Sequence, residues 1–199
     1  MASIEQTVKD QYAKFFTQSD WYAFKRIADY YFETAAHLKT KDIHVSGRFK
    51  RLVRNIQKRL FLGIGTELLI KAFYLKNGYG INKPNKGKDI LYKINSVSVE
   101  DYNVRDTYTI NFLIQEMEGG RVPEFAKDAN ILKGFKIAKI FRNKEGHVAV
   151  YSHKFDRDNY SDIEQALISF YRLYFNQALA FQVSMEPNEK SAFAIKQLN

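Results

Sequence analysis

Apolar residues recur at three- and four-residue steps over long stretches of the chain, the spacing of one face of an α-helix. Gly63 and Gly65 lie in the middle of the clearest stretch, residues 47–77, where each costs about 1 kcal/mol against Ala. We therefore expect a close helix crossing or a kink there, and a helix end at Asn77-Gly78. The repeating apolar positions of this stretch are Phe49, Leu52, Val53, Ile56, Leu60, Ile64, Leu68, Ala72 and Leu75.

The same spacing predicts five further helices and little else. Residues 78–100 contain several glycines and Pro84, so this segment is predicted to be a loop. Ser161 with Glu164 three residues later has the pattern of a helix start. The further helices are predicted over residues 4–17, 20–38, 104–118, 124–143 and 158–181.

These elements predict an all-α fold in one domain that spans residues 1–199. Residues 1–40 are expected to form a helical extension packed on a four-helix body over 47–185, followed by a polar tail at 186–199. The chain has 13 Tyr and 16 Phe but only 3 Pro and 10 Gly, which favours a folded, mostly helical protein.

The composition also limits the cellular compartments in which the protein is expected. The chain has no Cys, which excludes disulfides and thiolate metal sites and suits a reducing compartment. It has no apolar run of membrane-spanning length and no signal-peptide core at its start. We therefore expect a cytoplasmic protein that does not insert into a membrane.

The formal net charge of +9 favours a polyanionic partner, and part of the charge is concentrated in one segment. We expect its basic residues on the outer face of the long helix, where they would contact the phosphates of RNA. The alternative is a solvated helix face without a ligand. The residues are Arg48, Lys50, Arg51, Arg54, Lys58 and Arg59.

One short string carries candidate chemistry. Arg142 is followed directly by Asn143, and His147 comes five residues after the arginine, with Gly146 favouring a helix end between them. A histidine transfers protons near neutral pH, and a fixed cation stabilises charge that develops on a phosphate. The alternative is that Arg142 and its basic neighbours only stabilise the helix C-terminus.

With its place at the end of the third helix of a four-helix set, the string resembles the HEPN superfamily of helical domains. The signature of that superfamily is Arg, a polar residue, three to five further residues and His, and the resemblance covers about residues 47–185. It implies a homodimer that brings two motif copies to one cleft and cleaves RNA without metal or cofactor, in a toxin or a phage-defence system. It also implies that His147 is the general acid or base, that Arg142 stabilises the phosphate and that Asn143 orients either group.

Two further residues are candidates for support. The resemblance places an acidic residue of the long helix near the motif, which suggests Glu67; the alternative is an ordinary Glu67–Lys71 pair along the helix. His153 would be a second proton carrier, or simply a surface histidine.

The competing function is a non-catalytic helical module that binds RNA or a partner protein. The basic segment supports this function equally well. If the chain is a toxin, an antitoxin is a further possible partner. A plain structural bundle whose charge serves only solubility is a third possibility.

Overall fold

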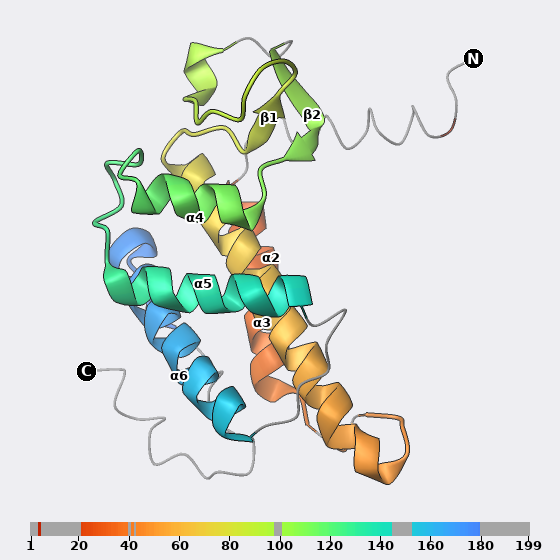
Figure 1. Cartoon of the computed structure of the whole chain (residues 1–199). Coiled ribbons are helices and arrows are strands. Elements are labelled where there is room, and N and C mark those ends of the chain that lie inside the picture. The colour runs from red at the N-terminus through yellow and green to blue at the C-terminus, as the bar shows by residue number, and fades with distance from the viewer. Residues whose placement is uncertain are drawn as a thin grey trace. The chain divides into compact units, whose positions relative to one another are not determined.

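The computed structural model describes residues 4, 21–39, 41, 43–97, 101–144 and 153–179. Helices dominate these residues, with one small antiparallel sheet, so the mostly helical expectation is confirmed and strict all-α is not (Figure 1). The elements are α2 (Trp21–His37), η2 (Gly47–Phe49), α3 (Lys50–Lys76), β1 (Asn82–Pro84), η3 (Ile94–Ser96), β2 (Tyr102–Thr107), α4 (Ile110–Glu118), α5 (Ala129–Lys144), α6 (His153–Phe170) and the π-helix η5 (Tyr171–Phe175).

The described chain divides into two compact units, with boundaries inside α2, inside α3 and in the segment between α4 and α5. The hairpin unit comprises the described parts of residues 1–26 and 68–126, and the helical unit those of residues 27–67 and 127–199. The sequence predicts one domain, because two of the three boundaries fall within uninterrupted helices rather than at Gly- or Pro-rich linkers.

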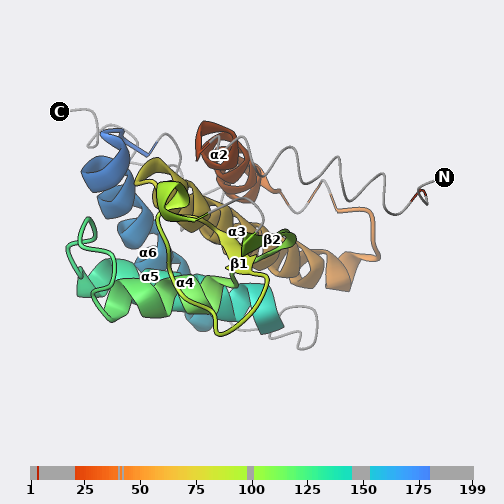
Figure 2. The same cartoon turned by 90° about the horizontal axis from the view of Figure 1, so that it is seen from above.

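In the helical unit, α5 packs against α6 and crosses it at an angle (Figure 1 and Figure 2). Gly134 permits this packing, because a Cβ at that position would overlap the side chain of Ala166. Beside it the rings of Phe135 and Phe170 meet edge to face, with their centroids 4.9 Å apart. The Tyr171 hydroxyl of η5 donates a hydrogen bond of 2.5 Å to Asp29 of α2, and burial raises the pKa of this tyrosine.

The two glycines of α3 mark close helix crossings, as predicted. A Cβ at Gly63 would lie 2.7 Å from the backbone nitrogen of Arg142 in α5. A Cβ at Gly65 would lie 2.7 Å from the ring of Phe32 in α2. Two successive crossings within one turn explain why glycine stands at positions where it weakens an isolated helix.

The hairpin unit corrects the helix predicted over residues 104–118. Residues Tyr102–Thr107 form β2 instead, paired with β1 in the register Asn82↔Thr107 and Pro84↔Tyr102. The helix begins only at α4, where the Thr109 hydroxyl accepts a hydrogen bond from the amide of Phe112. The predicted loop over 78–100 likewise contains β1.

The remaining bounds differ in smaller ways. The segment predicted as a helix from residue 124 becomes helical at α5, where the Asp128 carboxylate accepts bonds from the amides of Asn130 and Ile131 at 2.8 and 3.0 Å. The predicted start at Ser161 is wrong, since α6 already begins at His153 and Glu164 is buried within it.

The predicted helix over 4–17 lies outside the described residues apart from Ile4, and the polar tail lies wholly outside them. Among the helices described, none has the length and apolar character needed to cross a membrane.

Candidate functional site

Arg142 lies in the last turn of α5 and forms an ion pair with Glu67 of α3, both within the helical unit. The bond joins Arg142 Nε to Glu67 Oε2. The Glu67 side chain is only 10% exposed, whereas that of Arg142 is 43% exposed. A buried carboxylate therefore holds a guanidinium that still reaches solvent.

Asn143 adds a second, weaker contact to the same arginine. Its side-chain oxygen accepts a hydrogen bond of 3.4 Å from Arg142 Nη1. The structure thus brings together three of the residues predicted from the sequence, Glu67, Arg142 and Asn143.

The histidines of the prediction are not placed. His147 lies outside the described residues, and only the backbone of His153, at the start of α6, lies within them. Their proposed roles in proton transfer stay predictions.

The crossing of α3 and α5 explains why Glu67 and Arg142 meet. Gly63 stands one turn before Glu67, and Ala138 one turn before Arg142, so each small residue shares a helix face with one member of the pair. A Cβ at Gly63 would lie 2.8 Å from the carbonyl oxygen of Ala138, which shows how closely the two backbones approach. This close approach brings the short Glu67 side chain within reach of the arginine.

This arrangement suits the binding of a phosphate. Guanidinium has five N–H donors in a planar fork and stays charged at all working pH values. A carboxylate that fixes one edge of the fork orients the others, which lowers the entropy that a bound anion has to overcome. A half-exposed Arg142 is accessible to such an anion.

The predicted basic face on α3 is wrong for three of its six residues. Arg54, Lys58 and Arg59 are only 6, 7 and 0% exposed. Of the others, Arg51 is exposed, Lys50 is half-buried, and the side chain of Arg48 lies outside the described residues.

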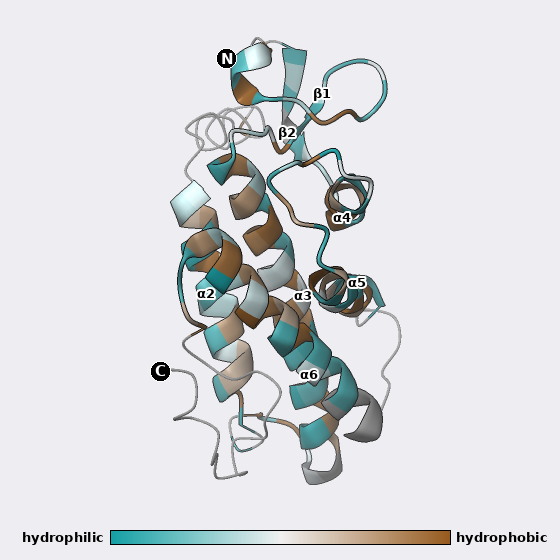
Figure 3. Cartoon of the chain, turned by 90° about the vertical axis from the view of Figure 1, so that its left-hand side faces the viewer, coloured by the Kyte–Doolittle hydropathy of each residue, from teal (hydrophilic) through white to brown (hydrophobic). Residues whose placement is uncertain are grey.

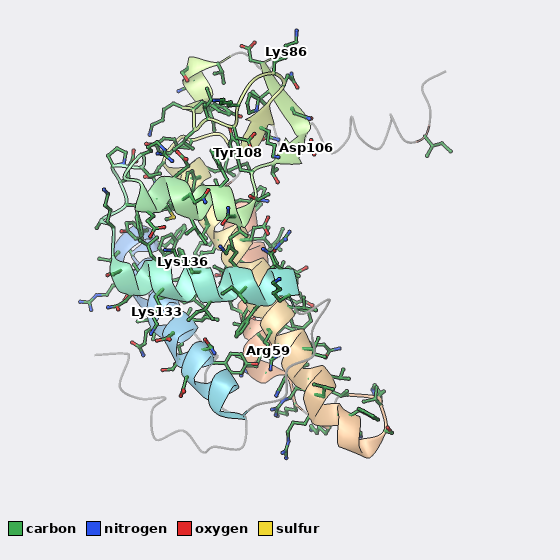
Figure 4. The ribbon with its side chains drawn as sticks, in the orientation of Figure 1. Arg59, Lys86, Asp106, Tyr108, Lys133 and Lys136 are labelled. Atoms are coloured by element: carbon green, nitrogen blue, oxygen red, sulfur yellow. The ribbon has the colours of Figure 1, made fainter. Side chains whose placement is uncertain are left out.

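Two of the buried cations, Lys58 and Arg59, lie over aromatic rings of the helical unit. The Lys58 ammonium is 4.6 Å from the ring centre of Tyr160, and the Arg59 guanidinium, labelled in Figure 4, is 5.8 Å from that of Phe141. Cation–π contacts and the packing of the long aliphatic stems stabilise such inward cations. The stripe of α3 that turns inward here is therefore partly polar, in keeping with the mixed teal and brown along this helix in Figure 3.

The cations of α5 form a run that sequence reasoning assigns only to stabilising the helix C-terminus. Lys133, Lys136, Lys139 and Arg142 follow one another at three-residue steps, and Lys144 completes the last turn. Figure 4 labels the first two on this helix. Lys133 is paired with Asp162 of α6 at 2.8 Å. The sequence already contains this regular spacing, but its denser cluster of cations at 48–59 makes that segment the predicted RNA contact.

Among the residues that the structure describes, no group of three or more His, Cys, Asp or Glu side chains is arranged to hold a metal ion. Comparison of the chain with protein-family models, with curated proteins and with solved structures found no match in any of the three.

Proposed function

We propose that this protein is a metal-independent endoribonuclease whose active site is built on Arg142. The observation that carries the proposal is the ion pair that holds this half-exposed guanidinium against the buried Glu67 at the end of α5. The proposal includes membership of the HEPN superfamily, a homodimer, and a role as a toxin or in phage defence.

The reaction would proceed by attack of the ribose 2′-hydroxyl on the adjacent phosphorus. His147 would accept the hydroxyl proton as the new O–P bond forms, and Arg142 would stabilise the added negative charge on the phosphate. The bond from phosphorus to the 5′-oxygen then breaks, and that oxygen takes up a proton. The products are a 2′,3′-cyclic phosphate and a 5′-hydroxyl.

The test is cleavage of a mixed single-stranded RNA in EDTA by the wild type, Arg142→Ala and His147→Ala. Lys144→Ala is the matched control for the arginine, because it removes an exposed cation from the same helical turn. His44→Ala, at an exposed position outside the motif, is the control for the histidine.

We expect the two motif variants to lose at least about a hundredfold in rate and the two controls to lose little. Products should end in cyclic phosphates. Equal activity in every variant would assign the cleavage to another site or to a contaminant, and an inactive, folded wild type would refute the proposal.

The second candidate is a helical module that binds RNA without cleaving it. The cations along α5 favour this function, because contact with RNA phosphates needs these cations but does not need His147. An inactive wild type whose affinity for RNA falls steeply with salt would support it.

A further inference from the structure

The hairpin unit contains a hollow of about 610 Å³, a volume within the range of small-molecule sites in proteins. The lining residues that the structure describes come from the segment that runs from the end of β1 to the start of β2. They are Pro84, Asn85, Lys86, Ile90, Tyr92, Val97, Asp101 and Tyr102.

The hollow is built around a pair of tyrosines. The rings of Tyr92 and Tyr102 are stacked at 24° to each other, with their centres 5.9 Å apart. Tyr92 lies against the backbone of Gly80, where any Cβ would overlap its ring. The amide of Gly80 donates a bond of 3.0 Å to the carbonyl of Tyr92, which holds the backbone that carries this ring.

The rest of the wall is tied to the fold at two more points. The Asn85 amide donates to the carbonyl of Asp101 at 2.9 Å, and the Tyr108 hydroxyl donates to the carbonyl of Ile90. The side chain of Ile90 is nevertheless 61% exposed. The structure therefore holds a large apolar side chain at the surface, beside the aromatic pair.

The polar groups at the hollow are of both signs. Lys86, near the tip of the loop in Figure 4, offers an ammonium. The Asp101 carboxylate offers hydrogen-bond acceptors, and the side-chain amide of Asn85 offers both donors and an acceptor. All three are exposed. A ligand that suits these walls has a flat aromatic face, polar edges and a negative charge.

We propose that this hollow binds a nucleotide, with its base against the Tyr92–Tyr102 pair and Ile90, the base edge at Asp101 and Asn85, and its phosphate at Lys86. Aromatic side chains serve any base in this way because every base has a π-face. The nucleotide is either free or part of a single-stranded RNA. This proposal stands apart from the cleavage proposed above, since it uses no residue of the Arg142 site.

The probes are adenosine monophosphate, a single-stranded RNA hexamer and inorganic phosphate, titrated into the Arg142→Ala variant, whose use keeps RNA intact. The readouts are the ring resonances of Tyr92 and Tyr102 by NMR and the dissociation constants. We expect both nucleotide probes to shift these resonances and phosphate alone to leave them in place. A hexamer that binds at least about tenfold more tightly than the mononucleotide identifies an RNA strand as the ligand, and equal affinities identify a free nucleotide.

Two pairs of variants locate the contacts. Tyr102→Leu should weaken binding about tenfold or more, while Tyr102→Phe, which keeps the ring, should change it little. Lys86→Gln should weaken binding and reduce its salt dependence, whereas Lys88→Gln, in the same loop but outside the hollow, should do neither.

If Tyr102→Leu fails to fold, Lys86→Gln and Lys88→Gln still decide the test, because both replace exposed side chains. Unmoved tyrosine resonances, or equal effects of Lys86→Gln and Lys88→Gln on binding of the mononucleotide, would overturn the proposal. Loss of RNA cleavage in Arg142→Ala bears only on the other site, so the two proposals fail separately.

Discussion

At the scale of single residues, Gly63 sets the distance between α3 and α5. A Cβ there would lie 2.7 Å from both the backbone nitrogen and the Cβ of Arg142. Backbone atoms inside a helix cannot give way, so Gly63→Ala should force the crossing apart and destabilise the protein by roughly 1–3 kcal/mol. This range is the net loss, after the roughly 1 kcal/mol that alanine gains over glycine within a helix. Chemical denaturation measures the difference.

The matched control is Gly47→Ala, because a Cβ at Gly47 would have nothing within 4 Å. This variant should unfold within about 0.5 kcal/mol of the wild type. Should Gly63→Ala be as stable as Gly47→Ala, the two helices are not held as closely as the structure has them. Displacement of Arg142 should also lower RNA cleavage in Gly63→Ala, if the proposed activity is correct.

At the scale of elements, three side chains form a cluster in the hairpin unit. They are Tyr79, shortly after α3, Lys93, directly before η3, and Glu124, in the segment after α4. Glu124 accepts hydrogen bonds of 2.9 Å from both the Tyr79 hydroxyl and the Lys93 ammonium. The ammonium also lies 3.5 Å from the centre of the Tyr79 ring and donates to the carbonyl of Asn77 at 2.9 Å. An antiparallel β-bridge already pairs Tyr79 with Lys93, and the cluster ties the segment at Glu124 to that pair.

This cluster should make stability depend on pH in the acid range. Burial acts to raise the pKa of Glu124, but the bonds from Lys93, from its own backbone amide and from Tyr79, together with the charge of Lys93, outweigh burial, and the pKa lies below its ordinary value. The folded protein therefore binds this proton less tightly than the unfolded chain, so the stabilisation is present above the ordinary pKa and is lost as the pH falls through the folded one. Because the pair is partly exposed, Glu124→Gln should lose no more than about 1 kcal/mol at pH 7.

The difference between the wild type and Glu124→Gln should shrink toward zero below about pH 4, as urea unfolding at several pH values would show. Glu118→Gln, an exposed carboxylate on α4, controls for the change in net charge. A difference that stays constant from pH 7 to pH 3 would mean that the carboxylate charge of Glu124 contributes nothing.

How far the elements follow from the sequence depends on what each pattern can encode. The apolar spacing predicts α3 almost to the residue, and its two glycines predict the crossings. The strand β2 was missed because the apolar spacing of α4 continues back to Tyr108, which is buried but precedes the helix. Only Tyr108 and the cap at Thr109 separate the two elements, and a three-residue β1 offers no pattern to pair with.

The candidate site was predictable in residue types but not in surroundings. The Arg-His string predicts Arg142 and the family resemblance predicts Glu67 as site residues, and the structure brings the two into contact. The inward-facing Lys58 and Arg59 were not foreseen, because charged residues are rarely buried and periodicity assigns them to the solvent side. Which aromatic rings lie beneath them depends on the packing of α5 and α6, which no local pattern contains.

At the scale of the whole molecule, the proposed dimer makes the cleavage testable by complementation. Five residues along an ideal helix turn it by about 500°, so Arg142 and His147 of one chain would not share a face if α5 simply continued. A site made from Arg142 of one chain and His147 of its partner removes that difficulty, because a two-fold axis brings two surfaces together without a shared helix face.

Mixing equal amounts of Arg142→Ala and His147→Ala chains, each inactive alone, should then restore activity. In a mixed dimer, one of the two composite sites has both Arg142 and His147 intact. Random exchange makes half of the dimers mixed, so about a quarter of the wild-type rate should return. Analytical ultracentrifugation, with a chain mass of 23.3 kDa, verifies that dimers are present. Dimers that exchange subunits yet recover no activity would show that each site takes both residues from one chain, and a monomer with full wild-type cleavage would refute the shared site altogether.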